Sequence, residues 1–286
     1  MSRIILLLLT IIFCASVHSG EFAVAPMVIN IEGEKNKPIP FEFTVKAKKS
    51  GKVVLKIYDL NQVETGHMGF MEGDSSNKSS KAHWIKIKEN KFALKSGDYR
   101  VAKGTIKIPS RARGQHLAAI MVEEVQSEEE KKGISVNVRY AVVLKINTDN
   151  GKKRRTRTKT KFEDLSFRKV EEGWEFEGYF KNLSKVEGHL NTELQLRSKD
   201  RRLVGRLQLK TLSAWQRNED ASMVYPGSRV KVFGVLPKNI VEGTYQIRIK
   251  NTFNRRNQPV FRHEITLSEQ GNTSPDQAEV KGLAGS

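Results

Sequence analysis

The chain has 286 residues, a length expected for two medium domains or one large domain. Hydrophobic residues make up 38% and charged residues 29%, which excludes collagen-like, coiled-coil and wholly disordered chains. Fifty lysines and arginines against 32 acidic residues give a net charge of +18, so an extended partner surface is expected to be anionic. Composition alone indicates no reaction.

Residues 1–19 have the pattern of a secretory signal peptide. Arg3 precedes an apolar run from Ile4 to Cys14, and small residues follow up to Ser19. The sequence therefore predicts an exported, periplasmic protein. Cys14 is the only cysteine, so the mature chain should lack disulfides and thiol chemistry. No other stretch approaches the about 20 apolar residues of a membrane span, so no transmembrane segment is expected in the mature chain.

Separate runs in which every second residue is apolar recur between Phe22 and Ile146, which predicts half-buried strands. The expected strands are Phe41–Lys46, Val53–Tyr58, Trp84–Lys88, Phe92–Leu94, Val101–Ile108 and Leu117–Val122. Glycine and serine predict a long loop over Gly66–Ser80. A second, charged loop is expected over Glu123–Gly133, with its acidic side chains in solvent.

The segment Ile134–Ile146 is apolar or aromatic at every even position, which predicts one long strand. At about 3.3 Å per residue it would span about 40 Å, roughly twice a typical strand. We therefore expect part of its apolar face to project beyond its own core. The alternative is a bent strand that switches sheets within one barrel.

A strongly basic run follows at Asn150–Lys161, with seven lysines and arginines and no acid. Like charges repel and extend the backbone, so the run is interpreted as a linker at a domain boundary. The alternative is contact with an anionic envelope polymer or lipid surface through Lys152, Lys153, Arg154, Arg155 and Arg157. Because the chain is expected to be exported, no nucleic-acid partner is predicted.

The strand pattern resumes after this run, with the rhythm of an immunoglobulin-like sandwich. The expected strands are Leu165–Val170, Trp174–Asn182, Leu190–Arg197, Leu203–Lys210, Arg229–Val235, Tyr245–Asn251 and Phe261–Leu267. The predicted fold is all-β, with two immunoglobulin-like β-sandwich domains joined by a basic linker. The expected boundaries are 20–148 for the N-terminal domain, 149–163 for the linker, 164–269 for the C-terminal domain and 270–286 for a flexible tail.

Motifs for catalysis are missing from the sequence. The mature histidines are far apart and lack zinc-binding spacing, and no GxSxG, P-loop or GxGxxG motif occurs. We therefore predict no enzyme, no cofactor and no metal. The remaining function is binding, by an edge strand that completes a partner's sheet. Ile134, Val136 and Val138 are placed for this role.

Three segments together resemble the PapD-like periplasmic pilus-assembly chaperones, most closely the alternative and archaic branches of the chaperone–usher group. These segments are Phe22–Pro26, the turn Ile108–Gly114 and the run Ile134–Lys145. The resemblance implies an L-shaped chaperone that lends its last N-domain strand to pilin-like subunits and works with an outer-membrane usher.

The resemblance also implies roles for single residues. Ile134, Val136, Val138 and Tyr140 would be donor-strand residues, and Lys145 would bind the subunit's C-terminal carboxylate through a charge-assisted hydrogen bond. The alternative for Lys145 is a surface lysine near a strand end. Two features depart from the family: Phe22–Val45 contains no arginine for a second carboxylate anchor, and no arginine–proline pair follows the last strand.

A second resemblance is to exported surface proteins with paired immunoglobulin-like domains, such as the WxL-interacting type. It rests on Met223–Ser228 and Glu242–Tyr245. It implies a surface scaffold or adhesion-type module that binds a surface protein or an anionic wall polymer. The two hypotheses differ at Ile134–Val138, which a donor strand would leave as an exposed edge and a scaffold module would cover.

Overall fold

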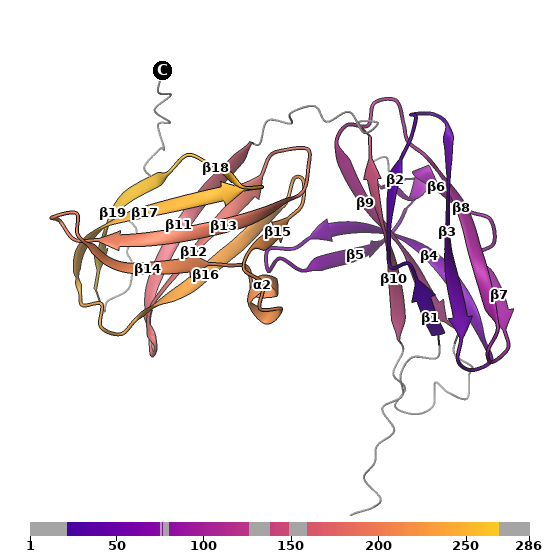
Figure 1. The fold of residues 1–286 in the computed structure, drawn as a ribbon, viewed down its shortest axis with the longest axis horizontal. Coiled ribbons are helices and arrows are strands. Elements are labelled where there is room, and N and C mark those ends of the chain that lie inside the picture. Colours follow the sequence, from indigo (N-terminus) through magenta and orange to yellow (C-terminus); the bar gives the residue numbers. More distant parts are fainter. Residues whose placement is uncertain (1–21, 75, 77–79, 126–137, 149–158, 269–286) are drawn as a thin grey trace, which may run out of the picture. The chain divides into compact units, whose positions relative to one another are not determined.

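The computed structural model describes residues 22–74, 76, 80–125, 138–148 and 159–268 (Figure 1). The predicted signal peptide, the tail, and Ile134 and Val136 lie outside the described residues. The chain divides into two compact units, and the second takes in residues 60–71 and 111–117 as well as 146 onward. The predicted class is confirmed: the protein is all-β, with two immunoglobulin-like β-sandwich domains.

Two antiparallel sheets form the N-terminal sandwich. The first has the order β1-β3-β8-β6, with bounds Phe22–Ala25, Pro38–Ala47, Tyr99–Lys107 and Ile85–Ile87. The second has the order β2-β10-β9-β4-β5, with bounds Val28–Glu32, Arg139–Asn147, Gln115–Glu124, Gly51–Gln62 and Met68–Glu72. A further strand, β7 (Lys91–Leu94), pairs with β4. Alternation along each strand sends one set of side chains into the core.

The N-terminal segment contributes to both sheets of this sandwich. β1 pairs with β3, and β2 pairs with β10, so the chain changes sheets at Pro26. Phe22 and Ile31, one on each strand, are both buried. The segment therefore covers one flank of β10 with a strand from the opposite end of the domain sequence.

The stretch Gly66–Ser80 is not the long loop that its composition predicts, because it contains strand β5. Gly66 has φ of +86°, and its N–H donates to Val63 O at 2.9 Å, which closes a tight turn before β5. Glycine and polar residues are typical of both long loops and hairpin turns, and here they form a hairpin. A short 3₁₀ helix, η1 (Ala82–Trp84), replaces the start of the strand expected from Trp84.

The C-terminal sandwich also has two antiparallel sheets. One has the order β11-β12-β16, with bounds Thr160–Val170, Gly173–Asn182 and Arg229–Pro237. The other contains β14, β13, β17 and β18, with β15 on β13 and β19 on β17; their bounds are Leu203–Leu209, Gly188–Arg197, Gly243–Phe253, Arg256–Asn257, Ser222–Val224 and Phe261–Leu267. The helix α2 (Leu212–Gln216) lies between β14 and β15. Because β11 begins at Thr160, residues 160–163 of the expected linker belong to a strand.

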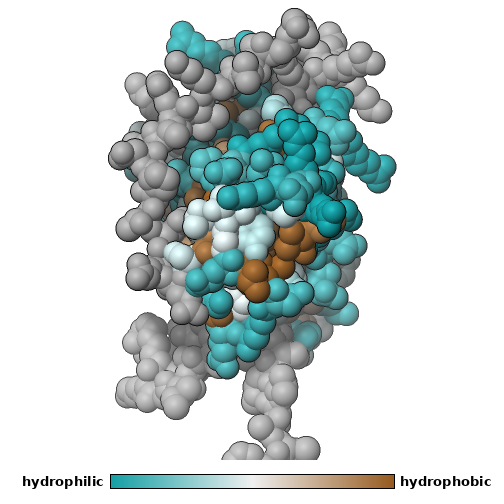
Figure 2. Space-filling view, turned by 90° about the vertical axis from the view of Figure 1, so that its left-hand side faces the viewer, coloured by the Kyte–Doolittle hydropathy of each residue, from teal (hydrophilic) through white to brown (hydrophobic). Residues whose placement is uncertain are grey.

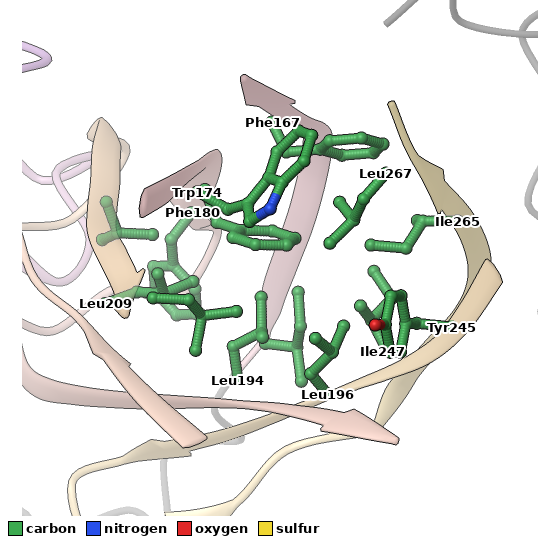
Figure 3. Close-up of a cluster of buried hydrophobic side chains, with 14 of the residues drawn as sticks. Phe167, Trp174, Phe180, Leu194, Leu196, Leu209, Tyr245, Ile247, Ile265 and Leu267 are labelled. Carbon is green, nitrogen blue, oxygen red and sulfur yellow. The ribbon is translucent and has the colours of Figure 1, made fainter. Parts of the chain in front are cut away.

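Large apolar side chains from both sheets meet in the C-terminal core (Figure 3). Trp174 and Phe180 point inward from β12, toward Leu194 and Leu196 on β13. The indole N–H of Trp174 donates to Ile240 O at 3.1 Å, so its polar atom is satisfied inside the core. Polar and charged residues alternate outward, and the face in Figure 2 is mostly hydrophilic where its residues are described.

Candidate functional site

The described part of the predicted donor strand is β10, which lies between β2 and β9 in its sheet. Val143 N donates to Met27 O at 2.8 Å on the β2 side. β10 therefore has a neighbouring strand on each side at Val143. Val138 precedes β10, although the sequence predicts it inside a strand; Ile134 and Val136 lie outside the described residues.

Burial changes steadily along one face of this segment. Val142, Leu144 and Ile146 are each 0% exposed and belong to the core. Two residues earlier on the same face, Tyr140 is half-buried, and Val138 is 37% exposed. Since side chains at every second position share a face, the apolar face leaves the core toward the N-terminal end of the segment.

A buried carboxylate lies where β9 ends, beside the start of β10. Glu123 is 6% exposed, accepts a hydrogen bond from Tyr58 Oη at 3.3 Å and forms ion pairs with Lys56 at 3.1 Å and Arg139 at 3.6 Å. Its hydrogen bond and negative charge raise the pKa of Lys56. The cluster joins the first residue of β10 to two neighbouring strands.

The sequence-based interpretation of Glu123 as a solvated loop residue is therefore wrong. β9 is buried on both faces from Leu117 to Val122, and the strand continues through Glu123 instead of ending before it. Such a strand shows no alternation to mark which acid turns inward. The partners Lys56 and Arg139 come from distant parts of the chain, which sequence spacing does not reveal.

Lys145 lies on β10 on the face opposite to the buried Leu144 and Ile146, and its side chain is half-buried. This position agrees with a lysine near the end of the strand. Its role as a carboxylate anchor stays a prediction. The basic-run residues proposed to contact anionic surfaces lie outside the described residues: Lys152, Lys153, Arg154, Arg155 and Arg157.

Arg229 is the centre of a charged cluster in the second unit, which the sequence did not suggest. Its guanidinium group donates to Asp164 at 2.8 Å, to Glu163 at 3.2 Å and to Glu64. It also lies over the ring of Tyr179, 3.4 Å from the centroid. One guanidinium group therefore pairs with three carboxylates, including one from residues 60–71.

Gln62 makes a second attachment within the same unit. Its buried amide donates to Met223 O at 2.8 Å and to Gly66 O at 2.9 Å, and its oxygen accepts from Tyr225 N at 3.0 Å. All these partners are backbone groups, so the contact depends on the shape of the chain more than on the partner side chains. Residues 60–71 are thereby bound to β15 and the turn after it.

The Arg229 cluster predicts an acid-sensitive contribution to stability. Hydrogen bonds from Lys161 and then Arg229 hold the pKa of Glu163 below its ordinary value of 4.5. This contribution is present above pH 4.5 and is lost as the pH falls through the lower pKa of the folded state. We expect Glu163→Gln to cost about 1 kcal/mol or less at neutral pH, because the cluster is partly exposed.

The measurement is urea unfolding of the wild type and Glu163→Gln at neutral pH and at about pH 3. The difference between the two proteins should shrink at the lower pH, because the ionised fraction of the wild-type carboxyl group falls as the pH approaches its folded-state pKa. A difference that stays constant or grows on acidification would contradict a stabilising charge at Glu163.

Two kinds of site are missing from the described part of the chain. It holds no group of three or more histidine, cysteine, aspartate or glutamate side chains that could bind a metal ion. In the same residues, no helix has the length and apolar character needed to cross a membrane.

Comparison with known proteins gives matches in structure only. No family model matches the sequence, and no curated protein matches it. A solved chaperone–tip adhesin complex from CFA/I fimbriae biogenesis is 12% identical, covering 85% of this chain and 98% of that chain, with a TM-score of 0.46. The CsuC–CsuE chaperone–tip adhesion subunit complex of archaic Csu pili from Acinetobacter baumannii is 13% identical, covering 74% and 89%, with a TM-score of 0.42.

The periplasmic chaperone SfaE is a third match, 12% identical over 84% of this chain and 98% of that chain, with a TM-score of 0.39. At such identities the similarity concerns the fold alone. Fimbrial chaperones, the group that the sequence resembles, are thus among the solved structures similar to this chain. The roles assigned to Ile134, Val136, Val138, Tyr140 and Lys145 stay predictions.

Proposed function

We propose that this chain is a periplasmic chaperone that caps pilin-like subunits with the strand segment before β10. The observation that supports the proposal is the loss of burial along one apolar face, from Val142 through Tyr140 to Val138. Ile134 and Val136 continue the same alternation in the sequence. An apolar face that leaves its own core is suited to filling the core of another protein.

The proposed mechanism is β-augmentation. The backbone of residues 134–138 would pair with an edge strand of the subunit, and Ile134, Val136 and Val138 would fill successive pockets in it. The contacts of Glu123 with Lys56 and Arg139 would fix where the segment leaves the sandwich. Backbone pairing would provide affinity, and the apolar side chains would select the register.

Further parts of the proposal rest on the resemblance to PapD-like chaperones. Lys145 would bind the subunit's C-terminal carboxylate, and Tyr140 would extend the apolar contact toward the core. An outer-membrane usher would receive the complex from this chaperone, which residues 1–19 would direct to the periplasm. The chemistry is binding, with no catalytic step.

The test compares two double variants that place the same charges on opposite faces of one segment. Ile134→Glu with Val136→Glu changes the apolar face, whereas Ser135→Glu with Asn137→Glu changes the other face. Each protein is purified natively from its own envelope, and co-purifying proteins are identified by mass spectrometry. We expect small pilin-like subunits with the wild type and the control, and at least about tenfold less with the apolar-face variant, because charge burial opposes pairing.

Two results would overturn the proposal. One is a wild-type protein that brings no small subunit with it, and the other is an apolar-face variant that keeps the same partners. Either result would favour the exported scaffold or adhesion-type module that the second resemblance implies. Thermal unfolding of both variants shows whether the sandwich itself is intact.

A further inference from the structure

Arginines gather on the outer face of one C-terminal sheet, across three neighbouring strands. Arg248 on β17 lies directly opposite Arg262 on β19, and Arg197 on β13 lies opposite Gln246 on β17. Alternation places all four residues on the face away from the core. They line an open hollow of about 620 Å³ together with Arg201, and Glu264 is the single carboxylate among its lining residues.

On the other sheet of the same sandwich, cations are paired with carboxylates. There Arg168 lies opposite Glu175 and pairs with it at 2.5 Å, and Lys231 pairs with Glu177. By contrast, within the described residues no ion pair joins Arg248 or Arg262 to a carboxylate. Like charges directly opposite each other destabilise a sheet. The Arg248–Arg262 pair is therefore expected to lower the stability of this sheet, which indicates a role other than folding.

Within this arginine face, which consists of Arg197, Arg248 and Arg262, one side chain is held in place by hydrogen bonds. Gln195 lies next to Arg248 across the strands and is 2% exposed, although it is on the outer face. Arg197 donates to Gln195 Oε1 at 3.2 Å and to Arg201 O at 2.8 Å. The Nε atom of Arg248 is buried and makes no hydrogen bond within the described residues. One guanidinium is therefore fixed, and its neighbour retains an unused donor.

We propose that this face binds a group carrying two or more phosphate oxyanions. The planar guanidinium offers paired donors that match phosphate oxygens, and such bonds are stronger than neutral ones. Strands lie about 4.8 Å apart, so β13 and β19 are separated by about 10 Å. Arg197 is held by Gln195 and Arg201, so a single phosphate could join it to Arg262 only if these bonds broke, whereas linked phosphates can reach both.

The binding test uses the full chain and two double variants that each remove two positive charges. Arg248→Gln with Arg262→Gln changes the arginine face, and Arg255→Gln with Arg256→Gln changes two exposed arginines outside the hollow as a matched control. The soluble probe is tripolyphosphate, measured by calorimetry. The surface probe is a vesicle of phosphatidylcholine with phosphatidylglycerol, compared with phosphatidylcholine alone in a flotation assay.

We expect the face variant to bind at least one probe about tenfold more weakly than the wild type, and the control variant to stay within about threefold. An effect on tripolyphosphate alone identifies a site for soluble polyphosphate, and an effect on vesicles alone identifies headgroups at a lipid surface. Equal losses in the two variants would show attraction by net charge and overturn the proposal. So would a face variant that binds both probes like the wild type.

A single variant keeps the test valid if the double variant fails to fold. Arg262 is exposed, so Arg262→Gln should leave the thermal unfolding midpoint unchanged. We expect it to weaken binding of the same probe about threefold or more, because one of the opposed guanidinium groups is removed. Unchanged binding by this folded variant would also overturn the proposal.

Discussion

Replacing Trp174 by alanine should lower the free energy of unfolding of the C-terminal sandwich by about 3–5 kcal/mol. The side chain is 0% exposed and packs against Phe167, with ring centroids 6.5 Å apart. Its removal would leave a large cavity and deprive Ile240 O of its hydrogen-bond donor. Urea unfolding followed by far-UV circular dichroism measures the change.

Trp215 offers a matched control, because it is the same residue type with a different environment. It is 42% exposed, although its indole N–H donates to Phe233 O at 3.2 Å. We expect Trp215→Ala to cost about 1 kcal/mol or less, since most of the lost surface already faces water. Equal costs for the two variants would contradict the assignment of Trp174 to the core.

Several strands of the C-terminal sandwich could be predicted from sequence because they have one buried face. The expected strand Trp174–Asn182 corresponds to β12, Gly173–Asn182, and Phe261–Leu267 corresponds to β19. Trp174, Phe176 and Phe180 alternate with charged residues, so the pattern shows both the strand and its inner face. This pattern lies within one strand and does not depend on which strands are its neighbours.

Features that depend on the pairing of distant strands could not be predicted. The acid Glu123 becomes buried because Lys56 and Arg139 reach it from other strands. Arg248 meets Arg262 only in the observed register of β17 and β19, and a shift of one residue would place them on opposite faces. The sequence shows these charges but not which ones become neighbours.

The segment from Val138 through β10 has one feature that the sequence predicts and one that it does not. Its alternation predicts the face shared by Val138, Tyr140 and Val142, and the observed burial agrees with a face that leaves the core. The covering of β10 by β2 was not predicted, because it depends on the chain changing sheets at Pro26. This cover gives β10 a neighbour on the β2 side at Val143, five residues after Val138.

A buried amide in the C-terminal sandwich should matter nearly as much as its aromatic core. Asn182 is 0% exposed at the end of β12, and its side chain donates to Val186 O at 2.9 Å and to Val224 O at 3.1 Å. Its oxygen accepts from Ser184 N at 3.0 Å. One side chain therefore satisfies three backbone groups in the turn between β12 and β13 and on β15.

We expect Asn182→Leu, which keeps a branched side chain but replaces its polar atoms with larger methyl groups, to lower the free energy of unfolding by about 2–4 kcal/mol. The cost arises because buried backbone groups lose their partners while no apolar contact replaces them. Asn191→Leu is the control, since Asn191 is exposed on β13 and should change stability by about 0.5 kcal/mol or less. Urea unfolding of both variants decides the point: a cost below about 1 kcal/mol for Asn182→Leu would mean that water or a shifted turn replaces the amide.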